Sequence, residues 1–137
     1  MLTTTKKSYY GVLALIDLAY HFEKGLLQIK EIAGRNNIPR NYLEQLLNRL
    51  LKSGLIRSIR GTKGGYALAK DPSTITLLQV IEAMEGEVSP SDFWSEFSPV
   101  EKIFSRVSSN VRDLLSVSLK ELLEQKSKSD NISIYYI

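Results

Sequence analysis

Residues 38–68 read IPRNYLEQLLNRLLKSGLIRSIRGTKGGYAL, and the spacing of the apolar residues changes partway through them. Four leucines in the first half recur at the spacing of one helix face: Leu43, Leu46, Leu47 and Leu50. The sequence therefore predicts a helix that opens at Ile38-Pro39, where proline fits the first turn. We expect this helix to run to about Ser53 and to stop at Gly54.

After Gly54 the pattern becomes extended. Residues 55–60 and 66–69 have the composition of two short strands. Between them lies Gly61-Thr62-Lys63-Gly64-Gly65, a glycine-rich tip that is typical of a tight connection. The sequence therefore predicts a β-hairpin directly after the helix.

The residues before this segment predict two further helices. Residues 8–23 are apolar on most faces, which indicates a central buried helix that ends at Lys24-Gly25. Leu26–Gln28 predict a very short strand, and residues 29–36 predict a short helix that ends in a turn at Asn36-Asn37. Its inward face would carry Ile29, Ile32 and Ala33. The order helix, short strand, helix, turn, helix, hairpin is that of a winged helix-turn-helix.

A capping box begins the helix that follows the hairpin. Thr76 and Gln79 have the spacing of such a box, and this helix is expected to reach Glu85 and stop at Gly86. We expect a mainly α-helical fold with a small β-hairpin wing, in one compact domain overall. Its parts would be a DNA-binding region at 1–86, a polar and aromatic linker at 87–97, and a dimerisation helix with a tail at 98–137.

The last part of the chain predicts one long helix. Ser98 with Glu101 forms a second possible capping box, Pro99 suits the first helical position, and the helix is expected to continue to about Gln125. Twenty-seven residues at ~1.5 Å each would span roughly 40 Å, more than a compact domain of this size needs. We therefore expect a two-fold homodimer, the alternative being a monomer whose helix wraps its own core. The expected dimer contacts are Phe104, Val107, Val111, Leu114 and Ser118. Residues 132–137 alternate weakly and predict a terminal strand.

Composition excludes several kinds of protein. The chain has 137 residues, of which 43% are apolar and 24% charged, which is typical of a soluble globular domain. It has no cysteine and one histidine, so thiolate-held metals, disulfides and sites with two histidines are excluded. The N-terminus lacks the features of a signal peptide and no apolar run could span a membrane, so we expect a cytoplasmic protein.

The net charge of +3 hides a strong division along the chain. Residues 1–70 hold 12 Lys/Arg against 4 Asp/Glu, and residues 71–137 hold 6 against 11. Residues 35–70 hold eight basic residues and one acid, Glu44. Such a segment attracts a polyanion, either nucleic acid or an anionic membrane, although it could also be a solvated surface balanced by the acidic half. The acidic half is a solvated surface or a docking site for a protein partner.

The helix at 40–52 has a polar face opposite its leucines, which consists of Asn41, Gln45, Asn48, Arg49 and Lys52, with Glu44 at its edge. Amide and guanidinium groups match base edges in the major groove, and glutamate can accept from cytosine. This face predicts a recognition helix. The alternative is the polar side of an ordinary amphipathic surface helix.

The hairpin tip is the more specific feature, because Arg57, Arg60 and Lys63 lie on or beside three glycines. Glycines let backbone N–H groups approach a phosphate, and an arginine at such a tip can enter a narrow minor groove. A flexible hairpin that needs glycine only for its turn is the alternative. The spacing excludes a phosphate-binding P-loop, which would lead into a helix.

The combined motif resembles the Rrf family of bacterial winged-helix regulators. The residues that carry the resemblance are Tyr42-Leu43-Glu44-Gln45-Leu46, Gly54-Leu55-Ile56, and Arg60-Gly61 followed by Gly64-Gly65-Tyr66 and Leu68. The similarity continues through Ile75-Thr76 and Glu85-Gly86, so it covers at least residues 5–90. The final Tyr135-Tyr136-Ile137 also resembles the CymR-like branch of that family.

The resemblance implies a homodimeric transcription factor with its recognition helix in the major groove and its wing in the minor groove. It also implies that a long C-terminal helix forms the dimer. By position, the DNA-contacting residues it implies are Tyr42, Glu44, Gln45 and Arg49 on the helix, and Arg60, Thr62, Lys63 and Gly64 on the wing.

The chain departs from the family at residues 87–97, where cluster-binding members place three cysteines and this sequence has none. We therefore expect no cofactor, and the iron chemistry of those members does not transfer. Regulation would come from another ligand, from a partner protein, or from protein abundance alone.

Two other features have competing interpretations. His21 lies in an apolar helix without a second ligand at helical spacing, so a structural role is favoured over a catalytic or metal site. Trp94, with Phe93 and Phe97, either lines a small effector pocket or packs the linker onto a helix, and packing is favoured.

These features together predict a sequence-specific DNA-binding transcriptional regulator, a repressor that acts on a pseudo-palindromic operator. A winged-helix module that docks a protein is the alternative from another class, but it would not need eight basic residues against one acid. An enzyme is disfavoured, because no combination of acid, base and nucleophile is apparent.

Overall fold

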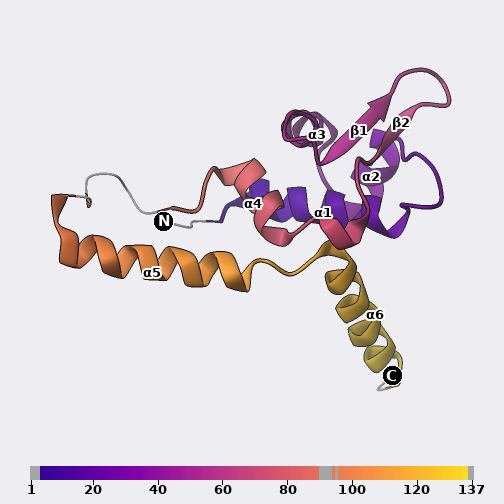
Figure 1. Ribbon diagram of the computed structural model, residues 1–137. Helices are drawn as coiled ribbons and strands as arrows, with labels where there is room; N and C mark the ends of the chain where they lie inside the picture. Colours follow the sequence, from indigo (N-terminus) through magenta and orange to yellow (C-terminus); the bar gives the residue numbers. More distant parts are fainter. Residues whose placement is uncertain (1–3, 90–93, 95, 136–137) are drawn as a thin grey trace.

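The computed structural model describes residues 4–89, 94 and 96–135. Its elements follow in the order α1 (Lys6–Tyr20), α2 (Ile29–Asn36), α3 (Arg40–Lys52), β1 (Ile56–Ile59), β2 (Gly65–Leu68), a 3₁₀ turn (Pro72–Thr74), α4 (Leu77–Glu85), α5 (Ser98–Leu114) and α6 (Leu119–Tyr135). A body of α1–α4 and the hairpin lies at one end, and most of α5 projects away from it (Figure 1). The predicted winged helix-turn-helix is confirmed.

Helix α1 is the centre of the body and packs against α3, α4, α6 and β2. Ala14, Leu15 and Leu18 are buried in its middle, where they meet the leucine face of α3. The helix begins earlier and ends earlier than predicted, since Thr5 caps its start and the last helical residue is Tyr20 rather than Glu23. It ends because the N–H of Phe22 bonds to the Ala19 carbonyl, three residues back, and the chain then reverses at Gly25.

The reversal after α1 returns the chain to the wing. Leu27 exchanges backbone hydrogen bonds of 2.8 and 2.9 Å with Tyr66, so the predicted short strand is a single bridge beside β2. Helix α2 spans the residues predicted for it, and Asn37 ends it in the left-handed conformation. The turn to α3 is closed by the N–H of Ile38 on the Ala33 carbonyl.

Helix α4 confirms the first capping box. The Thr76 hydroxyl accepts from the N–H of Gln79, and the Gln79 side chain accepts from the N–H of Thr76. The helix stops at Glu85, with Gly86 after it, as predicted.

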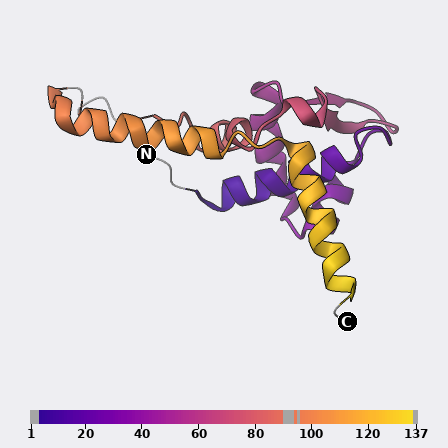
Figure 2. The same ribbon diagram turned by 60° about the horizontal axis from the view of Figure 1, so that its bottom comes forward.

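The prediction of a single long C-terminal helix is wrong, because α5 ends at Leu114 and a separate helix, α6, begins at Leu119 (Figure 2). The carbonyls of Leu115 and Val117 accept from the N–H groups of Leu78 and Leu77 at the start of α4, both at 2.9 Å. A continuous helix would have used these carbonyls internally. The tertiary bonds therefore replace one turn of helix.

The other terminal predictions need correction too. The capping box at Ser98 is not formed: Phe97 is the N-cap, Ser98 is already helical, and Glu101 accepts from the Ser105 hydroxyl instead. Residues 132–135 are helical rather than extended, and 136–137 lie outside the described residues. Pro99 does lie in the first turn of α5, as predicted.

Trp94 packs against α5, with its ring centroid 5.3 Å from that of Phe104. This agrees with the packing interpretation of the linker aromatics, while Phe93 lies outside the described residues and Phe97 is exposed. None of the helices described combines the length and the apolar composition that a bilayer crossing requires.

Candidate nucleic-acid interface

Helix α3 presents the predicted polar face. The four predicted core leucines are buried, and none is more than 1% exposed. Because they fix the rotation of the helix, the exposed positions are those predicted: Asn41, Glu44, Gln45, Asn48, Arg49 and Lys52. Helix α3, which carries these residues, lies at the edge of the body next to the hairpin (Figure 1).

Two of the predicted contact residues on α3 also have contacts within the protein. The ring of Tyr42 is half-buried and lies edge-on to Tyr10 of α1, at a centroid distance of 5.7 Å. The Arg49 guanidinium donates a 3.1 Å hydrogen bond to the Met84 carbonyl at the end of α4. Arg49 therefore ties α3 to α4 in addition to whatever it could contact outside.

The wing is an antiparallel pair in which Ile56 lies opposite Leu68 and Ile59 lies opposite Gly65. Gly64 is buried in the turn, and a side chain there would collide with the Ile59 carbonyl. Its N–H donates to the Gly61 carbonyl at 3.0 Å, so the amide that could have met a phosphate is already used within the turn.

The end of the wing is open. Arg57, Arg60, Thr62 and Lys63 are exposed, and Gly61 adopts a positive φ of 115° with open space around it. The side-chain amide of Gln28 donates a 3.4 Å bond to the Thr62 carbonyl, which supports the turn from the start of α2. The tip is therefore supported through the Thr62 carbonyl, while its cations are exposed.

A groove between α3, the start of α2 and the wing joins the two parts of the interface. It is lined by Gln28, Ile29, Lys30, Arg40, Asn48, Leu51, Ser58, Ile59, Arg60, Gly61, Gly64, Gly65 and Tyr66. Gln28, Lys30 and Arg40 line the groove but are not among the residues predicted for the interface. Arg40 belongs to the basic segment and could have been found there, whereas Lys30 reaches the groove only through the tertiary fold.

The cations around this groove are not neutralised by the body. In the described part of the chain, Lys30, Arg40, Lys52, Arg57, Arg60 and Lys63 form no ion pair within 4.0 Å. Arg35 differs, because it pairs with Asp17 at 3.2 Å. These unpaired cations can attract a polyanion that contacts α3 and the wing at the same time.

The arrangement offers binding rather than covalent chemistry. Among the described residues no three His, Asp or Glu side chains gather as metal ligands. His21 is used in the body: its Nδ1 lies 2.9 Å from the Asp17 carbonyl, which only accepts, so this nitrogen carries a proton. A helix-turn-helix with a polar recognition helix and a basic wing defines the class of winged-helix transcriptional regulators.

The sequence model of the Rrf2 family, described as an iron-dependent transcriptional regulator, matches residues 4–125. The chain belongs to the Rrf2 family. It is a transcriptional regulator rather than an enzyme, and this confirms the resemblance seen in the sequence.

Named relatives agree with this family. The HTH-type transcriptional regulator CymR of Bacillus subtilis is 34% identical over 133 residues, which cover 96% of this chain and 96% of that protein. The regulator IscR of Escherichia coli is 44% identical over 84 residues, 61% of this chain and 52% of its own length. The solved structure of B. subtilis CymR, described as the global cysteine regulator, has a TM-score of 0.81 at 35% identity and covers 91% of this chain and 98% of that one. These regulators favour DNA binding over the protein-docking alternative.

The iron in the family description does not fit this chain. The sequence has no cysteine, and its one histidine lies beside Asp17 without a third ligand in the described residues. No thiolate could hold a cluster.

Proposed function

We propose that the protein is a homodimeric, sequence-specific repressor that binds a pseudo-palindromic operator with α3 and the wing. The single observation that carries the proposal is the groove, where the exposed Asn48 amide of α3 lines the same surface as Lys30, Arg40 and Arg60, which form no ion pair in the described part of the chain. A protein of this kind would act in the cytoplasm, where bacterial DNA lies.

Helix α3 would supply the base contacts in the major groove. Asn41, Gln45 and Asn48 are exposed, and the side-chain amide of each can form two hydrogen bonds with the edge of one adenine. Glu44 can accept a hydrogen bond from cytosine. Tyr42 and Arg49, held against Tyr10 and Met84, would contribute through their outer atoms and by fixing the angle of α3.

The wing would supply minor-groove and phosphate contacts. Arg60 is exposed at the tip and can enter a narrow minor groove, where the potential is most negative. The other cations of the interface, Lys30, Arg40, Lys52, Arg57 and Lys63, would meet phosphates, with the Thr62 hydroxyl as a further donor. Gly64 would act indirectly, by permitting the tight turn.

The dimer would form along α5. Three apolar side chains on one face of this helix are exposed: Ile103 by 59%, Val107 by 38% and Leu114 by 80%. Their spacing of four and seven residues is that of a coiled-coil stripe, which a second copy could cover about a two-fold axis. The two α3 helices would then reach major grooves about 34–36 Å apart, or a multiple of that distance.

The salt dependence of binding to duplex DNA tests the proposal. An operator is first found by mapping bound DNA across the genome, and the dissociation constant is then measured from 50 to 200 mM salt. We expect log K to fall linearly with log salt, with a slope of magnitude roughly 0.9 for each phosphate contacted. A flat response, or equal affinity for the mapped site and random duplex, would overturn the proposal.

A further inference from the structure

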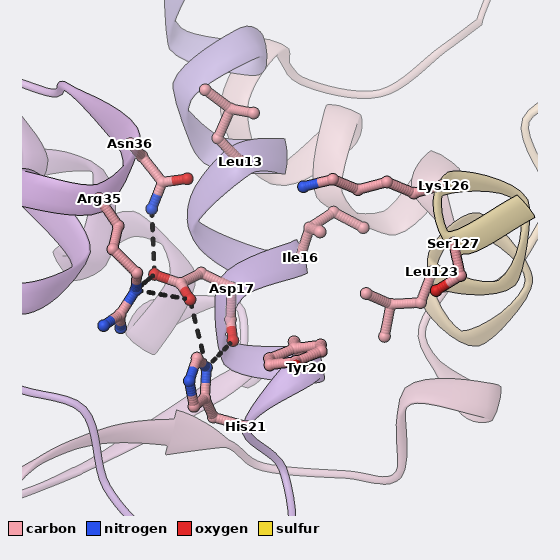
Figure 3. Close-up of a pocket in the computed structure, with 10 residues that line it drawn as sticks. All are labelled: Leu13, Ile16, Asp17, Tyr20, His21, Arg35, Asn36, Leu123, Lys126 and Ser127. Atoms are coloured by element: carbon pink, nitrogen blue, oxygen red, sulfur yellow. Dashed lines mark hydrogen bonds and ion pairs between the residues drawn. The ribbon is translucent and has the colours of Figure 1, made fainter. Parts of the chain in front are cut away.

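A second cavity lies at the end of α2, whereas the groove lies at its start; this cavity is formed among α1, α2 and α6 (Figure 3). It encloses about 500 Å³, which is within the size range of small-molecule sites. Ten residues line it: Leu13, Ile16, Asp17, Tyr20, His21, Arg35, Asn36, Leu123, Lys126 and Ser127. None of them belongs to the DNA-binding face proposed above.

One wall of the cavity is polar, but its negative charge is compensated. The Asp17 carboxylate is only 9% exposed and receives two 3.2 Å bonds from the Arg35 guanidinium and one of 3.0 Å from the Asn36 amide. The protonated Nδ1 of His21 lies 3.2 Å from the same carboxylate. Asp17 is therefore occupied, and it does not repel an anion as an unpaired carboxylate would.

The opposite wall combines a cation with apolar surface. Lys126 extends from α6 across the cavity toward Leu13 and Ile16 of α1 (Figure 3). Leu123 of α6 and the Tyr20 ring of α1 add further surface to this wall. In the described part of the chain, the Lys126 ammonium has no ion pair within 4.0 Å. The lining therefore contains one acidic residue, Asp17, and two residues with a fixed positive charge, Arg35 and Lys126.

We propose that this cavity binds a small organic carboxylate with an apolar body. The carboxylate would pair with the Lys126 ammonium, and the apolar part would cover Leu13, Ile16 and Leu123. A cation would meet Lys126 and Arg35 while Asp17 is already paired, and a fully apolar ligand would make no use of the exposed Lys126 ammonium. The site goes beyond the proposed function, because it needs no DNA.

The test uses the full chain without DNA and three matched probes, with binding measured by calorimetry and by saturation-transfer NMR. The probes are 4-phenylbutyrate, its neutral amide, and 4-phenylbutylamine, which has the opposite charge. We expect the carboxylate to bind, and the amide and the amine to bind at least tenfold more weakly, because each loses the charge-assisted hydrogen bond.

Two variants locate the site. Lys126→Gln removes the charge and keeps a polar side chain that is one atom shorter, and it should weaken binding of the carboxylate at least tenfold. Lys128→Gln removes an exposed charge from the same helix outside the cavity lining and should leave the affinity unchanged. The proposal is overturned if the carboxylate does not bind at millimolar concentration, if the amide binds equally well, or if both variants weaken binding alike. Because DNA is absent, failure here is distinct from failure of the repressor proposal.

Discussion

At the scale of single residues, the interface contains exposed side chains and residues that also hold the fold. Gln45 and Lys63 are exposed. Arg49 is bonded to Met84, and Gly64 closes the wing turn. Loss of an exposed residue therefore reports on DNA alone, whereas loss of Arg49 or Gly64 would also change the protein.

Replacement of Gln45 by alanine should relax sequence preference. The side chain is exposed in the middle of α3, so its removal costs no packing. Loss of one paired contact to a base edge should weaken the cognate site by about 1–3 kcal/mol and leave random duplex nearly unaffected. Competition binding against operators with single substitutions measures this preference.

Lys63→Ala is the matched change on the wing. If Lys63 meets a phosphate, its loss should weaken all duplexes similarly and lower the salt slope by about one. Salt titrations of both variants on specific and random DNA make the comparison. Identical behaviour of the two variants would contradict the division between base-reading helix and phosphate-binding wing.

The Asp71 carboxylate, at the turn after the wing, predicts a dependence on pH. The Ser73 hydroxyl at 2.6 Å and the Ser73 N–H at 2.8 Å both donate to it and lower the pKa of Asp71 below its ordinary value. Since the folded pKa lies below the unfolded one, the stabilisation is complete above the unfolded pKa and is lost as pH falls through the folded pKa.

Ser73→Ala removes the hydroxyl donor and keeps the N–H donor, so the pKa of Asp71 should return part of the way to its ordinary value. An NMR titration of the Asp71 carboxyl measures the shift directly. Ser53→Ala is a suitable control, because the Ser53 hydroxyl donates to the Leu50 carbonyl and not to Asp71. An unchanged Asp71 titration in Ser73→Ala would show that the hydroxyl bond is not the cause.

At the scale of elements, the decisive feature is where α5 ends and α6 begins. Ser118 is the cap of α6: its hydroxyl accepts from the N–H of Glu121, and the Glu121 carboxylate accepts from the N–H of Ser118. This capping box has the same spacing as the predicted box at Ser98, which is not formed. Ser118, a predicted dimer contact, is buried within its own chain.

Burial within the chain decides which residues of α5 are available to a second copy. Phe104 packs on Trp94 and Val111 is half-buried, whereas Ile103, Val107 and Leu114 are exposed. The dimer stripe that we propose therefore keeps Val107 and Leu114 and includes Ile103, which the apolar pattern of the sequence also places beside them.

Leu114→Glu should convert the protein to a monomer. Leu114 is 80% exposed, so the substitution should cost little folding stability while it places a charge in an apolar contact. Sedimentation equilibrium at micromolar concentration should give twice 15.5 kDa for the original chain and 15.5 kDa for the variant. Ser109→Glu adds the same charge at an exposed position outside the stripe and should remain dimeric. A monomeric original chain, or a dimeric Leu114→Glu variant, would contradict the proposed dimer.

At the scale of the whole molecule, polar contacts connect α5 to the recognition helix. Arg112 of α5 donates to Glu82 of α4 at 2.9 Å, and Glu82 also accepts from the N–H of Val88. Two residues after Glu82, the Met84 carbonyl accepts from Arg49 of α3. The body thus holds the projecting helix and the DNA-reading helix through the same short helix, α4, which would fix the distance between the two α3 helices of a dimer.

Iron should play no part in DNA binding by this protein. Because the chain has no cysteine, protein purified without oxygen should be colourless, and iron chelators should leave its affinity for the operator unchanged. Metal and sulfide analysis together with a chelator titration checks this. Stoichiometric iron and sulfide in the purified protein would contradict it.

The sequence by itself determined the local elements of the DNA-binding region. Leucine spacing fixed the buried face of α3, glycines marked the wing, and the box at Thr76 began α4. Each of these signals acts within a few residues, so neighbours along the chain are enough to establish it. The polar face of α3 and the exposed cations of the tip followed from the same short-range pattern.

Only the tertiary structure decided the C-terminal half and the composition of the groove. Residues 115–118 could have continued a helix, but the carbonyls of Leu115 and Val117 bond to the start of α4, about forty residues away in the chain. Lys30 and Arg40 reach the wing, and Arg49 reaches Met84, because helices distant in sequence pack on one core. Periodicity records which face of a helix is apolar, but it does not record which neighbour will satisfy a backbone carbonyl or a guanidinium, since that depends on how the elements are placed together.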